Sequence, residues 1–195
     1  MSDKPSYLGL LNAISLGESR AHAYLNEWIK VTTDPDVCAT LSTVAAREGE
    51  HGLSFAKRIN ELGFTLREKD DPNFDKSMAI AGSTSLTDFE KMEKLGLGRL
   101  DSGDKPDFFD DIFKDHSIDI RTGELMGRYI AEERDSGRLL KCCYEELKAR
   151  EARRGNGKGK GKSSATPGDL AALERKVDAI CAVVEDLRDM VSAKA

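Results

Sequence analysis

Apolar residues recur along the first third of the chain at alternate steps of three and four, the spacing that places side chains on one face of an α-helix. The first stripe consists of Leu11, Ile14, Glu18, Ala21, Leu25 and Trp28. The second consists of Val37, Leu41, Val44, Glu48, His51, Phe55, Ile59 and Leu62. Between them, Pro35 suits a first helical turn, and its Thr and Asp neighbours suit a helix cap. The pattern predicts an antiparallel helical hairpin with ionisable residues on its apolar faces.

The middle of the chain predicts two further helices. A weaker helical pattern runs from about Ser85 to Leu100, is broken at 101–106 and resumes at 108–113. A strong pattern begins near Ile118 and contains Met126, Tyr129, Glu133, Ser136, Leu140, Cys143 and Leu147. We therefore expect an all-α domain over residues 1–152, in which four helices pack as a bundle.

The C-terminal part predicts a linker and an oligomerisation helix. Residues 153–168 are mainly Gly, Lys and Ser, the composition of a flexible linker. Residues 169–195 carry a coiled-coil seam made of Leu170, Leu173, Val177, Ile180, Val184, Leu187 and Val191. A helix this short is marginal alone, so we expect a homo-oligomer, with dimer, trimer and tetramer left open.

Composition and charge narrow the classes of function. Charged residues make up 33% of the 195 and the net charge is −5, which argues against broad attraction to nucleic acid. The lysine-rich linker offers a basic arm, but no aromatic residue is interleaved for base stacking. The sequence has neither a signal-peptide pattern nor about twenty consecutive apolar residues, so we expect a cytoplasmic protein without a membrane segment. Its four cysteines form no C-x-x-C pair.

Three residues of the predicted hairpin carry a candidate chemistry. Glu18 lies fifteen residues before Thr33 and Glu48 fifteen after it, so an antiparallel hairpin places both carboxylates at the same height. His51 lies one turn beyond Glu48 on the same face. Carboxylates brought together away from water are costly unless they are protonated, hydrogen-bonded or neutralised by a cation. A Glu on one helix and Glu-x-x-His on the next form half of a di-iron carboxylate site in helical bundles, and such ligands suit iron or manganese.

Residues 6–150 resemble the ferritin-like superfamily, especially rubrerythrin-like proteins, through Glu18-Ser-Arg-Ala and Arg47-Glu-Gly-Glu-His51-Gly. The resemblance implies a ferritin-like antiparallel four-helix bundle that binds iron, reacts with peroxide or oxygen, and repeats the first half in the second. An offset of 85 residues aligns Glu133 with Glu48 but Ser136 with His51, so the second half-site is incomplete.

The predicted metal ligands are Glu18, Glu48, His51 and Glu133. A second chain could complete this partial set across a two-fold axis. The sequence also leaves open whether an aspartate completes it, the candidates being Asp101, Asp104 and Asp135.

Two interpretations of function follow. In the first, the chain is a rubrerythrin-like iron-binding protein, with manganese as the alternative metal. In the second, it is a catalytically degenerate ferritin-like bundle that serves as an oligomeric scaffold or adaptor through its coiled coil. Metal content separates them, because the scaffold should purify free of metal. We expect His22 to be a hydrogen-bonding group on the helix flank, and Tyr24, Tyr129 and Trp28 to pack in the core.

Overall fold

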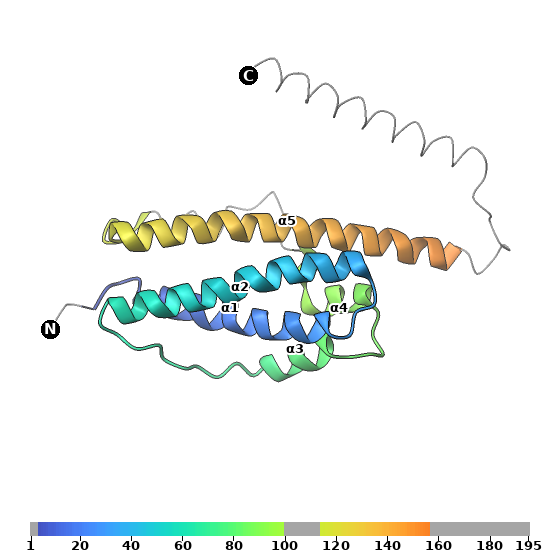
Figure 1. The fold of residues 1–195 in the computed structure, drawn as a ribbon, viewed down its shortest axis with the longest axis horizontal. Helices are drawn as coiled ribbons and strands as arrows, with labels where there is room; N and C mark the ends of the chain where they lie inside the picture. The colour runs from blue at the N-terminus through green and yellow to red at the C-terminus, as the bar shows by residue number, and fades with distance from the viewer. Residues whose placement is uncertain (1–3, 100–113, 157–195) are drawn as a thin grey trace, which may run out of the picture. The chain divides into compact units, whose positions relative to one another are not determined.

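The computed structural model describes residues 4–99 and 114–156 of the chain (Figure 1). Its elements are α1 (Leu8–Ile29), α2 (Pro35–Glu61), α3 (Phe74–Ala81), α4 (Asp88–Leu95), the short 3-10 helix η1 (Leu97–Arg99) and α5 (Ile120–Asn156). The described residues contain no strand, which confirms the predicted all-α class. None of these helices combines the length and apolar character needed to cross a membrane.

The predicted hairpin is formed by α1 and α2, which lie side by side and antiparallel (Figure 1). Its turn follows from local capping chemistry. Pro35 is the first residue of α2, and the Asp34 carboxylate accepts hydrogen bonds from the backbone N–H groups of Asp36 and Val37 at 3.0 and 3.3 Å. At the other end Gly63 has a φ of +83°, a left-handed conformation that glycine adopts without strain.

Helix α5 packs along α2 in the opposite direction (Figure 1). Near the start of α5, Asp119 accepts a hydrogen bond from Arg58, in the last turn of α2, at 2.9 Å. Towards the other end, Arg150 reaches Asp36 in the first turn of α2 at 3.1 Å. These two contacts at opposite ends set the register of α5 on α2.

Asp119 also receives bonds from other elements. It accepts from the Tyr7 hydroxyl at 2.8 Å and from the Thr122 backbone N–H at 3.1 Å. Burial alone would raise the pKa of Asp119, but hydrogen bonds from Thr122, Tyr7 and Arg58 lower it well below its usual value of 3.8. The ionised carboxylate therefore holds the beginning of α1, the end of α2 and the beginning of α5 together.

The third predicted helix differs from the structure. The pattern predicts one helix from Ser85 to Leu100, whereas α4 covers only Asp88–Leu95 and a second short helix, α3, precedes it. Thr87 fixes the start of α4 through a capping box with Glu90, and Gly96 ends it at a φ of +72°. Residues 100–113, which include the predicted continuation of the helix, lie outside the described residues. A four-helix bundle is therefore not established by the described elements.

The buried apolar residues form two clusters along the long helices. One contains Tyr7, Leu11, Ile14, Phe55, Ile59, Met126, Tyr129 and Ile130. The other contains Leu25, Trp28, Val37, Leu41, Val44, Ala45, Ala81, Met92, Leu97, Leu140, Cys143 and Leu147. Between them along the helices lies a layer of buried polar side chains, namely Ser15, Glu18, Glu48, His51 and Ser136. The core is thus interrupted at the level of the predicted ligands.

The chain divides into two units, residues Met1–Glu151 and Ala152–Ala195. Helix α5 runs through Asn156, so residues 153–156 of the predicted linker are helical. The rest of that linker and the predicted coiled-coil helix at 169–195 lie outside the described residues.

Candidate metal centre

Close packing of α1 against α2 sets the level of the first predicted ligands. The Ser15 hydroxyl donates a hydrogen bond to the carbonyl of Gly52 at 2.8 Å, which fixes the register of the two helices. A side-chain carbon at Gly52 would lie only 2.5 Å from the Ser19 hydroxyl oxygen, so glycine permits this approach. One turn away from Ser15, Glu18 therefore faces the part of α2 that carries Glu48 and His51, as the hairpin register predicts.

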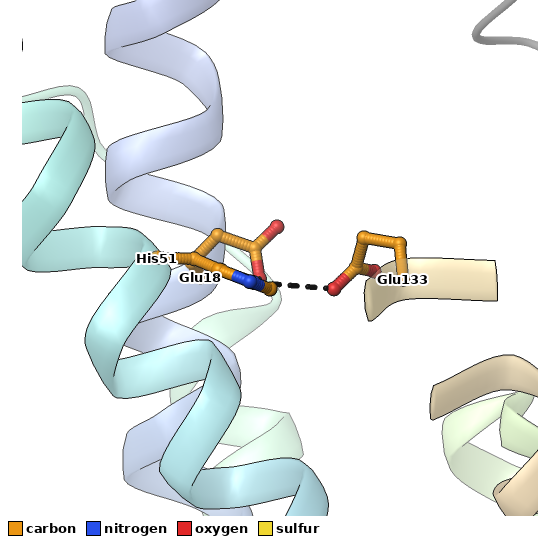
Figure 2. A group of neighbouring side chains, drawn as sticks. All are labelled: Glu18, His51 and Glu133. Carbon is orange, nitrogen blue, oxygen red and sulfur yellow. Dashed lines mark ion pairs between the residues drawn. The ribbon is translucent and has the colours of Figure 1, made fainter. Parts of the chain in front are cut away.

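Three side chains from three helices converge at this level (Figure 2). His51 Nδ1 lies 3.9 Å from Glu18 Oε2 and 3.4 Å from Glu133 Oε1. One ligand atom from each residue lies within 4.8 Å of the other two. His51 is 0% exposed and Glu18 is 8% exposed, whereas the Glu133 side chain is 22% exposed, so the group lies at the partly open edge of the core with its facing atoms buried.

The facing atoms of these three residues lack hydrogen-bond partners. Glu18 Oε2, His51 Nδ1 and Glu133 Oε1 are buried, and none of them takes part in a hydrogen bond. Each is an atom type that donates an electron pair to a metal ion. Buried polar atoms without partners are rare because each costs about 1–3 kcal/mol. Their convergence on one point is the feature that a bound cation would explain.

The remaining atoms of Glu18 and His51 are held by α5. His51 Nε2 lies 2.6 Å from Glu132 Oε2, and in the neutral imidazole a hydrogen bond from Nε2 to this carboxylate leaves Nδ1 with a free electron pair. The Tyr129 hydroxyl donates to Glu18 Oε1 at 2.9 Å, and its ring meets His51 edge-on with centroids 5.0 Å apart. These contacts orient the unpartnered atoms towards one another, as outer-shell partners do at metal sites.

Glu48, the fourth predicted ligand, is close enough to Glu18 for the two carboxyl groups to influence each other's pKa. Burial is the main cause that raises the pKa of Glu48, and the neighbouring Glu18 and Glu133 raise it further. Burial also raises the pKa of Glu18. Without a cation, this pair of carboxyl groups therefore retains a proton near neutral pH, because two adjacent buried negative charges repel each other.

The pKa of His51 is raised as well. Burial alone would lower it, but the interactions with Glu133 and Glu132 outweigh burial. Nearby Tyr24 has a raised pKa, first because of burial and then because Glu48, Glu18 and Glu133 are close. The electrostatic character of the whole cluster is that of excess negative charge, which favours the binding of protons or metal cations.

The other candidate residues do not join the cluster. Asp135 pairs with Arg47 at 2.8 Å and with Arg138 at 3.2 Å. Ser136 is buried and accepts a hydrogen bond from Arg47 at 3.3 Å. Asp101 and Asp104 lie outside the described residues.

The structure agrees with two of the predictions for histidine and aromatic residues. His22 lies against the backbone carbonyl of Ala45 at 2.6 Å, as expected of a helix-flank group. Tyr129 packs in the core as predicted, and it also contacts the candidate ligand Glu18.

The sequence interpretation missed Glu132. Its neighbour Glu133 continues the apolar stripe, whereas Glu132 lies beside the stripe, where charged residues are ordinarily solvated. The structure leaves its side chain 32% exposed while its carboxylate contacts the fully buried His51. A ligating histidine usually donates its second ring N–H to a carboxylate, so such a partner for His51 could be expected. The spacing of residues alone does not identify Glu132 as that partner.

Comparison of the chain with family models, with curated proteins and with solved structures gives no match. The resemblance to ferritin-like proteins therefore rests on the residues quoted for it, and both the family and its function stay predictions.

Proposed function

We propose that the chain binds a divalent transition-metal ion between α1, α2 and α5, with Glu18, His51 and Glu133 as protein ligands. The observation that carries the proposal is the convergence of three buried atoms without hydrogen-bond partners, Glu18 Oε2, His51 Nδ1 and Glu133 Oε1. A cation at this point would satisfy all three at once. It would also release the proton that the adjacent Glu48 and Glu18 share, since metal binding displaces protons from ligands.

The donor set favours iron or manganese. Two carboxylate oxygens and one imidazole nitrogen form a mixed oxygen and nitrogen site, which suits these metals better than calcium and, because it lacks thiolate, differs from structural zinc sites. Glu132 supports the assignment, because a histidine bound to a metal usually donates its second ring N–H to a carboxylate. Such an ion would supply redox chemistry towards peroxide or oxygen.

The finer proposal is that residues 6–150 adopt a fold related to ferritin-like bundles. Two observations support it: the antiparallel pairing of α1 with α2, and the meeting of Glu18 with the Glu48-x-x-His51 pair at one level. Glu133 on α5 adds the carboxylate that the second half of such a bundle would provide.

Elemental analysis of the full chain tests the proposal. The protein is expressed with added iron or manganese, purified without chelator, and assayed for metal per mole of chain. We expect stoichiometric metal in the wild type, strong loss in Glu18→Gln, and no loss in the control Glu50→Gln, which removes a carboxylate that pairs with Arg128 on the surface. A folded wild type that purifies without metal and takes up none on dialysis would refute metal binding and favour the scaffold interpretation.

A further inference from the structure

Arg47 lies at the edge of the candidate metal centre and makes contacts across to α5. Its Nη1 atom is 2.8 Å from Asp135 Oδ2 and donates a hydrogen bond to the Ser136 hydroxyl at 3.3 Å. Its side chain is 27% exposed, whereas Ser136 is 2% exposed. The guanidinium is therefore tethered to α5 by these two contacts, and Arg47 is next in sequence to Glu48.

We infer that the Arg47 guanidinium takes the place of a second metal cation beside Glu48, so that the centre holds one metal ion per chain. The inference rests on the proposed metal-binding function and specifies its stoichiometry. It makes Arg47 a residue that determines how many ions the site accepts.

The first argument concerns ligands. The described residues bring one group of three possible ligands together, Glu18, His51 and Glu133. A second ion beside Glu48 would need further donors from α5, and the position one turn after Glu133 is occupied by Ser136. That hydroxyl already accepts from Arg47 and offers neither the imidazole nor the carboxylate that iron and manganese prefer.

The second argument concerns charge. The negative charges of Glu18 and Glu133 act on Glu48, and the positive charge of Arg47 acts on it in the opposite sense. A guanidinium stays protonated at every physiological pH, so this positive charge is permanent. A second divalent ion near Glu48 would be repelled both by the first ion and by Arg47.

The third argument concerns the tether. Arginine presents several N–H donors in a rigid planar fork, and here Asp135 and Ser136 both contact its Nη1 atom. Asp135 in turn pairs with Arg138 on the surface of α5. Arg138 therefore provides a matched control. Replacing it removes one of the two arginine contacts of Asp135 without changing the charge beside Glu48.

The experiment measures manganese(II) binding to the full chain by equilibrium dialysis and records the electron paramagnetic resonance spectrum of the bound ion. We expect one manganese per chain with the spectrum of an isolated ion for the wild type and for Arg138→Gln. For the double variant Arg47→Gln with Ser136→His, we expect two per chain and the spectrum of a spin-coupled pair. A wild type that binds two coupled ions overturns the inference while leaving the metal-binding function intact.

Further outcomes separate the two proposals. A folded double variant that still binds one ion overturns the inference, whereas a wild type that binds none overturns the proposed function itself. Should the double variant fail to fold, the single variants decide. Arg47→Gln should bind the first manganese on the order of tenfold more tightly, because a repelling charge is gone, and Arg47→Lys should bind it like the wild type. Equal affinity in Arg47→Gln and Arg47→Lys overturns the inference.

Discussion

Metal-dependent stability gives the sharpest test of the centre, and Glu133→Gln is the most informative perturbation. In the metal-free protein this substitution should change the stability only slightly. The glutamine loses the attraction to His51, whose Nδ1 is 3.4 Å away, but it also relieves the repulsion from Glu18 and Glu48. Because these effects oppose each other, we expect the metal-free melting temperatures of the variant and the wild type to agree within a few degrees.

Adding metal should give the wild type a higher melting temperature than the Glu133→Gln variant. A ligand at 100 times its Kd stabilises the folded state by about 2.7 kcal/mol, which for a unit of this size raises the Tm by about 5–10 °C. Loss of one charged ligand should weaken binding about 100-fold, or about 2.8 kcal/mol. At the same manganese concentration the variant then gains only about 0.4 kcal/mol, a shift of about 1 °C.

The assay is thermal unfolding followed by circular dichroism, on chelator-treated protein with and without manganese(II). Glu50→Gln serves as the control, since Glu50 lies on the surface and pairs with Arg128 across the α2–α5 interface. Its metal-induced shift should equal that of the wild type. The reasoning is refuted if Glu133→Gln retains the full wild-type shift, or if all three proteins melt at the same temperature with and without metal.

Three further predictions concern the surroundings of the site. Glu132→Gln should weaken manganese binding about 10- to 100-fold without changing its stoichiometry, as measured by calorimetric titration, and unchanged affinity would contradict the orienting role of Glu132. Gly52→Ala should cost about 1–3 kcal/mol in urea unfolding and weaken manganese binding by separating α1 from α2, whereas Gly127→Ala, with open space around it, should be neutral or stabilising. Asp119→Asn should cost about 1 kcal/mol at pH 7, a figure discounted because the side chain is 39% exposed. Since the pKa of Asp119 is lowered from 3.8 in the folded state, that difference should persist above about pH 4 and shrink as the pH falls towards 2, and a difference independent of pH would be inconsistent with it.

The hairpin and its polar residues were predictable because two local rules agree. Proline and aspartate place the turn between α1 and α2, and the helical period then fixes which residues share a face. Glu18 and His51 therefore meet as predicted, with 3.9 Å between Oε2 and Nδ1. Glu133 was predictable for the same reason, since it continues the apolar stripe of α5.

Other features depend on contacts that spacing does not encode. The predicted third helix ends early because Gly96 adopts a left-handed conformation, whereas an apolar period alone would carry the helix further. Glu132 approaches His51 only because the register of α5 on α2 is set by ion pairs far along the helices. Arg47 reaches Ser136 for the same reason. Long-range register of this kind has no signature within either helix.

The polar layer also bears on the choice between a metal-binding protein and a scaffold. Three buried atoms without hydrogen-bond partners cost up to about 1–3 kcal/mol each, which is a large share of the 5–15 kcal/mol that typically stabilises a folded domain. In a scaffold that never binds metal, the ion pairs of a protonated His51 with Glu18 and Glu133 would offset only part of this cost, whereas a metal-binding protein recovers it when the ion is bound. The apolar clusters on either side of the layer can keep the metal-free chain folded despite this cost, because each cluster contains residues of all three long helices. The stability gained on adding metal is therefore the quantity in which the two interpretations differ most.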